Sequence, residues 1–331
     1  MPLHFPYKEK RVAKAVDFLT LTTYPMKVLL ATEKPFSKSA VDGIRNIVET
    51  AGHEFLLLEK YTDQADLLKA AADADALIIR SDKVTREVVD AAPNLKIVVR
   101  AGAGYDNVDC AVCTERRVVV MNTPGQNSNA VAELTIGMMI FMARNQYTPG
   151  TGTEICGKTL GIHAYGNIGR IVARYGKSLG MKVFAYDPFV TDENFLADGV
   201  TPVGSVEELY ERSNYLSLHI PATEQTRGSI GYSLLSKMPK GATLVNTARK
   251  EVIDEAGLLK ALAEREDLKY ITDIAAGNQA ELNEKFGKRV FATAKKMGAE
   301  TAEANVNAGL AAARQIVAFF RDGDRTFQVN Q

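Results

Sequence analysis

The stretch Thr159–Pro188 reads TLGIHAYGNIGRIVARYGKSLGMKVFAYDP and decides the fold of this chain. Its first residues, Thr159 to Ala164, are typical of a short buried strand, and Asn167 to Leu179 has the periodicity of an amphipathic helix. Lys182 to Tyr186 follows as a second apolar strand that ends at Asp187. The stretch therefore predicts one βαβ unit with a tight turn between its first strand and its helix.

The turn of this unit has the residues of a dinucleotide site. Its run Ala164-Tyr165-Gly166-Asn167-Ile168-Gly169 nearly matches the glycine-rich fingerprint, although Ala164 adds one methyl group where the first glycine would be. Gly166 would let the backbone approach a pyrophosphate, Gly169 would let helix and strand pack closely, and the helix N-terminus would offer free N–H groups. Asp187 lies 18 residues after Gly169, where a carboxylate would accept hydrogen bonds from ribose hydroxyls. It would also repel a 2′-phosphate, so the predicted cofactor is NAD rather than NADP.

Composition restricts the class of protein. The 331 residues are 46% hydrophobic with zero formal net charge, which indicates a globular chain of about two domains and favours neither nucleic acid nor a membrane surface as partner. Three cysteines, an odd number, argue against a disulfide framework and for a reducing compartment, so we expect a cytoplasmic protein. We interpret the lone Cys110-Ala-Val-Cys113 pair as two small buried side chains, and we expect no metal.

Apolar strands alternate with helical segments from Met26 onward, a pattern typical of parallel sheets covered on both faces. Helices are expected at Ser37–Ala51 and Thr62–Ala72. The other expected strands are Lys27–Ala31, Glu54–Leu58, Ala76–Ile79, Ile97–Val99, Val118–Met121, Tyr215–Ile220, Thr243–Asn246 and Tyr270–Ile274. The predicted fold is α/β, with two Rossmann-like, doubly wound parallel-sheet domains and a cleft between them.

Two long helices, Asn127–Arg144 and Thr301–Arg321, are expected to carry the chain between these domains. The first domain would then be discontinuous, with residues 26–121 plus 302–331 binding the substrate and residues 122–301 binding NAD. Residues 1–25 form an N-terminal extension of undecided role, with a helix possible at Lys8–Phe18. We also expect the apolar helix Asn127–Arg144 to expose surface that a symmetric homodimer would cover.

Four further runs resemble one family of enzymes. They are Arg80-Ser-Asp-Lys-Val-Thr85, Arg100-Ala-Gly-Ala-Gly-Tyr-Asp-Asn-Val-Asp109, Met121-Asn-Thr-Pro-Gly-Gln-Asn-Ser128 and Asn246-Thr-Ala-Arg249. Together they resemble the D-2-hydroxyacid dehydrogenases, from Met26 to about Phe320. The likeness is strongest to short phosphoglycerate dehydrogenases that lack a C-terminal regulatory domain. It implies NAD-dependent oxidation of 3-phosphoglycerate to 3-phosphohydroxypyruvate in serine biosynthesis.

The resemblance also implies roles for individual residues. The N–H groups of the loop Ala101-Gly102-Ala103-Gly104 would hold the substrate carboxylate. Arg249 would bind the carboxylate and the C2 oxygen together, as a fork-shaped guanidinium can. Arg80 would meet the substrate phosphate, although a solvated arginine at the end of a strand is an alternative. The cofactor would lie near His219, Ala248 and Asp273, and a purely structural role for His219 is equally compatible.

The chain departs from the family pattern at the proton-transfer site. The usual histidine before the last helix is absent, and alignment of the run around it places either Lys295 or Lys296 there. The usual glutamate position reads Asn278, with Glu281 nearby. Loss of the carboxylate and proximity of Arg249 would both lower the pKa of a lysine, since like charge and burial disfavour its ammonium form. We therefore expect one of these lysines to be the general acid/base.

Two other functions remain compatible with the sequence. One is a dehydrogenase of glycerate, hydroxypyruvate or lactate, and the other is an inactive NAD-sensing scaffold that tolerates loss of the histidine and glutamate. The retained Arg80, Arg249 and glycine-rich loop favour an enzyme with a charged substrate. Feedback regulation and the exact substrate are left open.

Overall fold

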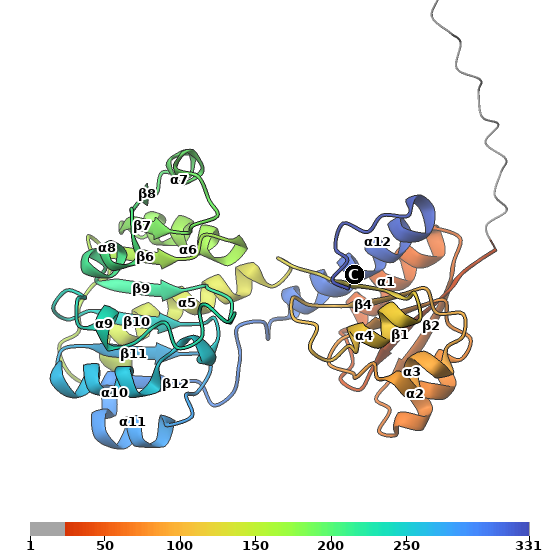
Figure 1. Cartoon of the computed structure of the whole chain (residues 1–331), viewed down its shortest axis with the longest axis horizontal. Coiled ribbons are helices and arrows are strands. Elements are labelled where there is room, and N and C mark those ends of the chain that lie inside the picture. Colours follow the sequence, from red (N-terminus) through yellow and green to blue (C-terminus); the bar gives the residue numbers. More distant parts are fainter. Residues whose placement is uncertain (1–23, 331) are drawn as a thin grey trace, which may run out of the picture.

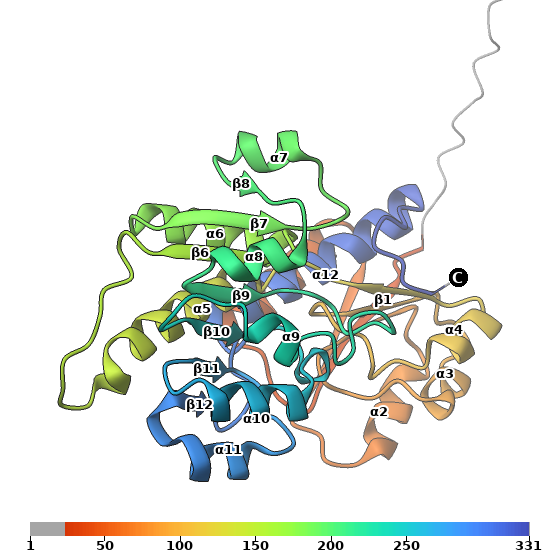
Figure 2. The same cartoon turned by 60° about the vertical axis from the view of Figure 1, so that its left-hand side comes forward.

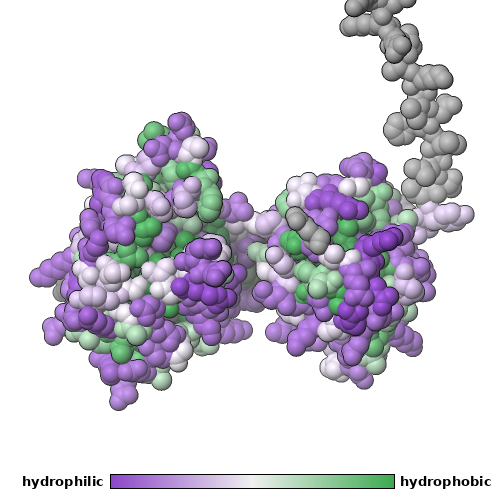
Figure 3. Space-filling model, viewed as in Figure 1, coloured by the Kyte–Doolittle hydropathy of each residue, from purple (hydrophilic) through white to green (hydrophobic). Residues whose placement is uncertain are grey.

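Two parallel β-sheets with helices around them organise the chain, which a computed structural model describes from Tyr24 to Asn330 (Figure 1). The possible helix at Lys8–Phe18, and residues 1–23 of the N-terminal extension, lie outside the described residues. The two lobes are distinct in Figure 1 and in the space-filling view of Figure 3, and they overlap in the turned view of Figure 2. The predicted α/β fold with two doubly wound sheets is confirmed.

The first sheet has five parallel strands in the order β2-β1-β3-β4-β5. Its strands are β1 (Lys27–Thr32), β2 (Glu54–Glu59), β3 (Ala76–Ile79), β4 (Ile97–Arg100) and β5 (Val119–Asn122). The helices of this lobe are α1 (Lys38–Thr50), α2 (Gln64–Ala71), α3 (Arg86–Ala91), α4 (Cys110–Glu115) and α12 (Ala302–Asp322). Helices α1 and α12 pack against each other and share one apolar core on one face, and α2, α3 and α4 line the core on the other.

The second sheet has seven parallel strands in the order β12-β11-β10-β9-β6-β7-β8. Its strands are β6 (Thr159–His163), β7 (Lys182–Tyr186), β8 (Thr201–Pro202), β9 (Tyr215–Leu218), β10 (Thr243–Asn246), β11 (Lys269–Thr272) and β12 (Val290–Ala292). Its helices are α5 (Ser128–Ala143), α6 (Asn167–Ser178), α7 (Asp192–Ala197), α8 (Val206–Arg212), α9 (Tyr232–Leu235), α10 (Glu255–Glu264) and α11 (Gln279–Phe286). Short 3₁₀ turns lie at Asn145–Tyr147, Lys250–Val252 and Gly287–Arg289.

The continuous apolar runs of the strands explain why both faces of a sheet are buried. Leu244 of β10 packs into the core on one face of the second sheet, and its neighbour Val245 packs into the core on the other. Successive side chains of a strand point to opposite faces, so a strand covered on both sides needs a continuous apolar run. The predicted strands match those observed, and the sequence reading missed β8 and β12, which are only two and three residues long.

Each sheet reverses its strand order at one point. In the first sheet the chain leaves β1 for β2 on one side and returns to β3 on the other; in the second it leaves β6 for β7 and returns to β9. In open α/β sheets the crevice beyond the carboxyl ends of the strands at such a reversal is where ligands bind. Lys34 and Arg80 follow the strands at the first reversal, and the Ala164 turn and His219 follow those at the second.

The C-terminal segment returns to the first lobe. Gln328 forms an antiparallel bridge with Met121 on β5, and the N–H of Val329 donates to the carbonyl of Val120 at 2.8 Å. The side chain of Asn330 accepts from the N–H of Val120 at 2.8 Å and donates to the carbonyl of Val118 at 2.9 Å. These contacts cover an edge strand that would otherwise expose unpaired backbone groups. They agree with assigning residues 302–331 to the first domain, although the exact domain boundaries stay a prediction.

The expectation of an exposed apolar helix is wrong. Met138, Met139 and Met142 of α5 are at most 4% exposed, and they pack with α6 into the core of the second lobe. The helix is apolar because its own lobe buries it on most sides, as happens for a central helix. The homodimer therefore stays a prediction without this support.

Two general features follow from the described residues. No helix between residues 24 and 330 has the length and apolar character that a membrane crossing needs. Within the same range no cluster of acidic, histidine and cysteine side chains could hold a metal ion. Cys113 is buried and Cys110 is half-buried, as expected for small packing side chains, and burial raises the pKa of the Cys113 thiol to about 12.

Candidate active site

The glycine-rich turn lies between β6 and α6, with Gly166 as the N-cap of the helix. Ala164 has a φ of +78°, the left-handed region in which glycine is favoured, so the backbone keeps the conformation of the fingerprint despite the methyl group. A Cβ on Gly169 would lie 2.4 Å from the carbonyl oxygen of Ala164 and 3.0 Å from a methyl of Ile162. A Cβ on Gly166 would meet nothing within 4 Å. The close approach explains why packing requires glycine at position 169. The absence of any neighbour within 4 Å of Gly166 leaves open space beside the helix N-terminus.

Asp187 lies next to this turn at the end of β7. Its carboxylate accepts from the N–H of Tyr165 at 2.8 Å and from the N–H of Phe189 at 2.9 Å. The Tyr165 ring is buried against Phe195, and its hydroxyl donates to Asp198 at 3.0 Å. The N–H and side chain of Tyr165 therefore serve the protein itself, which corrects the prediction of a direct cofactor contact from these groups. The N–H groups of Asn167 and Ile168 begin the helix.

These residues fit NAD. The helix N-terminus and the open space at Gly166 suit a pyrophosphate, and Asp187 is held where ribose hydroxyls would be recognised. His219 lies across the sheet reversal, its Nε2 2.9 Å from the hydroxyl of Ser217. Burial, and secondarily His163, lower the pKa of His219 to about 3, so its ring is neutral at physiological pH. Its buried Nδ1 has no hydrogen-bond partner within residues 24–330, a capacity that a bound group could use.

Two single methyl groups should separate packing from cofactor binding. Gly169→Ala is expected to lower the free energy of unfolding by about 1–3 kcal/mol or more, because its Cβ overpacks the turn. The same variant should bind NADH less tightly. Gly166→Ala should leave the melting temperature unchanged and still weaken NADH, because its methyl enters the space meant for the pyrophosphate. Thermal unfolding and NADH fluorescence titration check both, and full NADH affinity in Gly166→Ala would remove the turn from the cofactor site.

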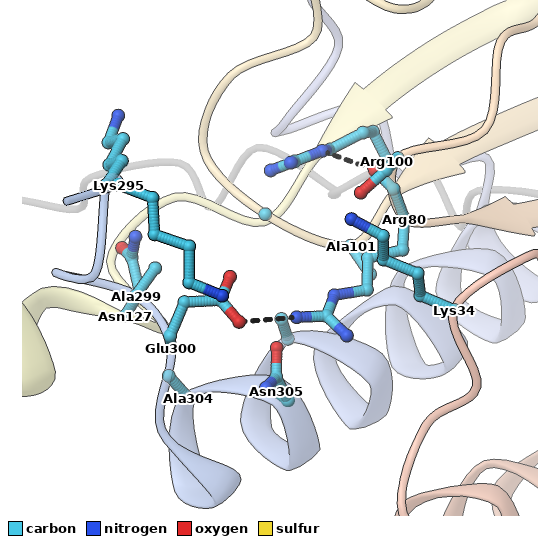
Figure 4. Close-up of a pocket in the computed structure, with 14 residues that line it drawn as sticks. Lys34, Arg80, Arg100, Ala101, Asn127, Lys295, Ala299, Glu300, Ala304 and Asn305 are labelled. Carbon is cyan, nitrogen blue, oxygen red and sulfur yellow. Dashed lines mark hydrogen bonds and ion pairs between the residues drawn. The ribbon is translucent and has the colours of Figure 1, made fainter.

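A second feature, a cavity of about 400 Å³, lies at the reversal of the first sheet. Figure 4 shows its lining side chains, which come from the first lobe, from the segment before α12 and from α12 itself. Its cationic side chains are Lys34, Arg80, Arg100, Lys295 and Lys296, and its one carboxylate is that of Glu300. Such an excess of positive charge in a concave site indicates an anionic ligand.

Arg100 and Lys34 are site residues that the sequence analysis missed. Arg100 ends β4 and pairs in register with Ile79, the residue before Arg80, so the two arginines lie at neighbouring strand ends. The guanidinium Nε of Arg100 donates to the carbonyl of Arg80 at 3.0 Å (Figure 4). Burial and then the nearby Arg80 lower the pKa of Arg100. An arginine at the end of β4 and another directly after β3, two neighbouring parallel strands, were the signal that could have identified Arg100.

A buried carboxylate supports the cationic wall from behind. Asp82 is 2% exposed and accepts from the Tyr61 hydroxyl and the N–H of Glu33, both at 2.7 Å, and from the N–H of Arg80 at 3.2 Å. It thereby joins the ends of β1, β2 and β3. The loop that carries Lys34 and the strand end that carries Arg80 are therefore held relative to each other.

The glycine-rich loop after β4 differs from its prediction in part. The N–H of Ala101 donates to the carbonyl of Ile79 and the N–H of Gly102 to the carbonyl of Arg100, both at 2.8 Å. These two N–H groups are not available to a substrate carboxylate, which corrects the expectation for them. Within residues 24–330 the N–H groups of Ala103 and Gly104 form no such bond and remain candidates.

Both candidate lysines line the cavity, and Lys296 has a distinct charge environment. Lys296 is solvent-accessible as a residue, yet its ammonium is in a partly desolvated and cationic environment. Burial, then Arg249 and Arg100, lower the pKa of Lys296 below the usual 10.5, against smaller opposite effects of Asp273 and Glu251. The tertiary structure thus perturbs Lys296 in the direction that a general base requires.

Asp273 holds the backbone beside these lysines. Its carboxylate, only 1% exposed, accepts from the N–H groups of Met297 and Gly298 at 2.8 Å each and from the hydroxyl of Thr293 at 2.9 Å. Asp273 therefore positions the segment that carries Lys296. Its predicted cofactor contact stays a prediction beside this structural role.

Comparison with known proteins identifies the family. Residues 134–306 match the sequence model of the D-isomer specific 2-hydroxyacid dehydrogenase, NAD binding domain. A hydroxypyruvate reductase of Thermotoga maritima is 35% identical over 238 residues, which are 68% of this chain and 75% of that protein. The chain belongs to the D-2-hydroxyacid dehydrogenase family. Its matched region is the NAD-binding domain of that family, and it contains the glycine-rich turn and both lysines.

Two further D-2-hydroxyacid dehydrogenases are similar to this chain. The NAD⁺-bound crystal structure of 3-phosphoglycerate dehydrogenase from Entamoeba histolytica is 50% identical with a TM-score of 0.81, and the match covers 93% of this chain and 99% of that one. A D-3-phosphoglycerate dehydrogenase of Methanocaldococcus jannaschii is 37% identical over 265 residues, 76% of this chain and 51% of that protein. This chain thus spans about half the length of the latter.

The departure of this family member from the usual histidine and glutamate has a structural counterpart. Asn278 begins α11 with its Oδ1 buried, and Glu281 pairs with Lys285 at 2.7 Å on the surface of the same helix. Neither is among the groups that act on the pKa of Lys296. The carboxylate that would raise the pKa of a proton-transfer group is therefore not directed at this lysine.

Arg249 lies just after β10. The side-chain amide of Asn246, fully buried, donates to the carbonyl of Arg249 and accepts from the N–H of Ala248, both at 3.0 Å. This clamp fixes the backbone, while the exposed guanidinium of Arg249 donates only to the carbonyl of Ala248 within residues 24–330, at 2.8 Å. Its other donors are available to a ligand.

Proposed function

We propose that this chain oxidises 3-phosphoglycerate to 3-phosphohydroxypyruvate with NAD. The observation that carries the proposal is the cavity with five cationic side chains and one carboxylate. A phosphorylated hydroxyacid brings a carboxylate and a phosphate of about −1.5 to −2 charge, whereas lactate, glycerate or hydroxypyruvate brings one negative charge. The Entamoeba histolytica relative, named as a 3-phosphoglycerate dehydrogenase, supports the same substrate class.

In this reaction each residue of the site has a separate role. Arg80 and Lys34 bind the phosphate, and Arg249 orients the carboxylate and the C2 oxygen. Lys296 in its neutral form takes the proton of the C2 hydroxyl and becomes an ammonium ion. A bound NAD would supply the acceptor for the hydride from C2. Asp187 and the turn at Gly166 hold the cofactor, and Asp273 keeps the Lys296 segment in place.

Substrate choice is tested by replacing Arg80. In Arg80→Gln, kcat/KM for phosphohydroxypyruvate should fall about 10- to 100-fold, which corresponds to one charged hydrogen bond of about 1.5–3 kcal/mol. The value for hydroxypyruvate should change little, because it lacks the phosphate. NADH consumption measured by absorbance with both substrates gives the comparison.

Lys83→Gln is the matched control, since it removes the same charge from an exposed position three residues away, outside the cavity. Equal losses for both substrates in Arg80→Gln would point to another hydroxyacid. Intact NADH binding with no turnover of any substrate by the native protein would instead favour the NAD-sensing scaffold.

A further inference from the structure

Among the described residues that line the cationic cavity, Glu300 is the one with an acidic side chain. Its Oε2 lies 3.7 Å from Nη2 of Arg80, and within residues 24–330 it is the carboxylate paired with that guanidinium (Figure 4). The Arg80 side chain is 16% exposed and that of Glu300 is 51% exposed. A half-buried cation is thus paired with a carboxylate that can move into solvent.

The placement of Glu300 follows from its backbone. Its N–H donates to the carbonyl of Met297 at 2.8 Å, closing a turn whose first residues are held by Asp273. The next residue, Thr301, is the N-cap of α12 and accepts from the N–H of Ala304 at 3.1 Å. Glu300 therefore lies on the short connection between the two lobes and reaches back into the first.

We infer that Glu300 is an internal competitor that sets the affinity for the phosphate group of the substrate. The inference rests on the proposed function in taking a phosphorylated ligand. Arg80 cannot keep its contact with Glu300 and bind a phosphate with the same donors. The carboxylate also repels an incoming dianion at this distance, and the pair is exposed enough for Glu300 to leave.

The test compares Glu300→Gln with the native protein at saturating NADH. The KM for phosphohydroxypyruvate should fall about 2- to 10-fold, a modest gain that suits a half-exposed ion pair and should shrink at high salt. The KM for hydroxypyruvate should not change. Glu303→Gln is the matched control, because it removes the same charge from an exposed site on α12 that does not line the cavity.

A double variant decides whether the effect passes through Arg80. In the Arg80→Gln background, Glu300→Gln should have no further effect on KM, whereas an equal gain there would overturn the inference. An unchanged or higher KM in the single variant would also overturn it, since Glu300 would then be helping Arg80 to bind.

Binding of inorganic phosphate separates this inference from the proposed function. The phosphate concentration that raises the melting temperature by a given amount should be lower for Glu300→Gln than for the native protein and for Glu303→Gln. This readout needs no turnover. Absence of turnover with a retained difference in phosphate binding would reject the proposed reaction and keep the role of Glu300, and equal phosphate binding in all three proteins would reject that role.

Discussion

Lys296→Ala should lower turnover of phosphohydroxypyruvate by about 10²- to 10⁴-fold, the usual contribution of a positioned general acid or base. NADH affinity should be retained, because no residue of the glycine-rich turn is changed. Lys295→Ala is the matched control, because it removes the same charge one residue away in the same cavity. The reverse outcome, with Lys295→Ala inactive and Lys296→Ala active, would assign the proton transfer to Lys295.

The pH profile gives an independent readout of the same residue. Oxidation needs the neutral amine, so its rate should rise with pH through the lowered pKa of Lys296 and beyond the range near 6.5 where a histidine would level off. Reduction needs the ammonium form and should decline as pH rises above that pKa. A profile for oxidation that is flat above neutral pH would contradict a lysine base.

Removal of Lys296 should not destabilise the protein at neutral pH. The pKa of Lys296 is lower in the folded protein than in the unfolded chain, so the unfolded chain binds this proton more readily. The charged lysine therefore costs stability below the folded pKa, and this cost disappears as pH rises through the window between the folded and unfolded values. A melting temperature of Lys296→Ala equal to or above that of the native protein at pH 7 would agree with this sign.

Arg249→Gln is expected to have the second largest effect, a loss of about 10²- to 10³-fold in kcat, as when one donor to a reacting oxygen is removed. The backbone should keep its conformation, because Asn246 holds it through Ala248 N–H and the carbonyl of residue 249. Because Arg249 lowers the pKa of Lys296, its loss should also move the pH profile of oxidation upward.

Lys250→Gln supplies the control for Arg249→Gln, because it removes a neighbouring exposed charge that is not among the groups acting on the pKa of Lys296. Steady-state rates across pH, measured by NADH absorbance, give both quantities at once. If Arg249→Gln lowers kcat without moving the pH profile of oxidation, Arg249 binds the substrate but does not set the pKa of Lys296. Unchanged kcat would remove Arg249 from the site.

Much of the fold of this protein can be predicted from local sequence alone. The apolar runs and glycine positions between Thr159 and Pro188 were sufficient to predict the βαβ unit, because strand burial and helix periodicity depend on consecutive residues. The close contact at Gly169 and the open space at Gly166 were likewise predictable from the fingerprint. Even the replacement of the first glycine by Ala164 kept its backbone conformation, with a φ of +78°.

Other features depended on contacts between distant segments. Periodicity indicated that α5 is apolar on most sides but not whether its own lobe or a second chain covers it, and the packed structure buries it within the lobe. Sequence spacing left Lys295 and Lys296 equivalent. The lowered pKa of Lys296 arises from burial and from Arg249 and Arg100, which are far away in the chain and come near it only in the folded protein.

The sequence by itself determined the two parallel sheets and the glycine-rich turn, since each depends on residues that are close in the chain. Only the tertiary structure brought Lys34, Arg80 and Arg100 together at one sheet reversal, placed Glu300 against Arg80 and partly buried Lys296 near Arg249. Electrostatic interactions act through space and depend on burial, so they exist only after the lobes have folded.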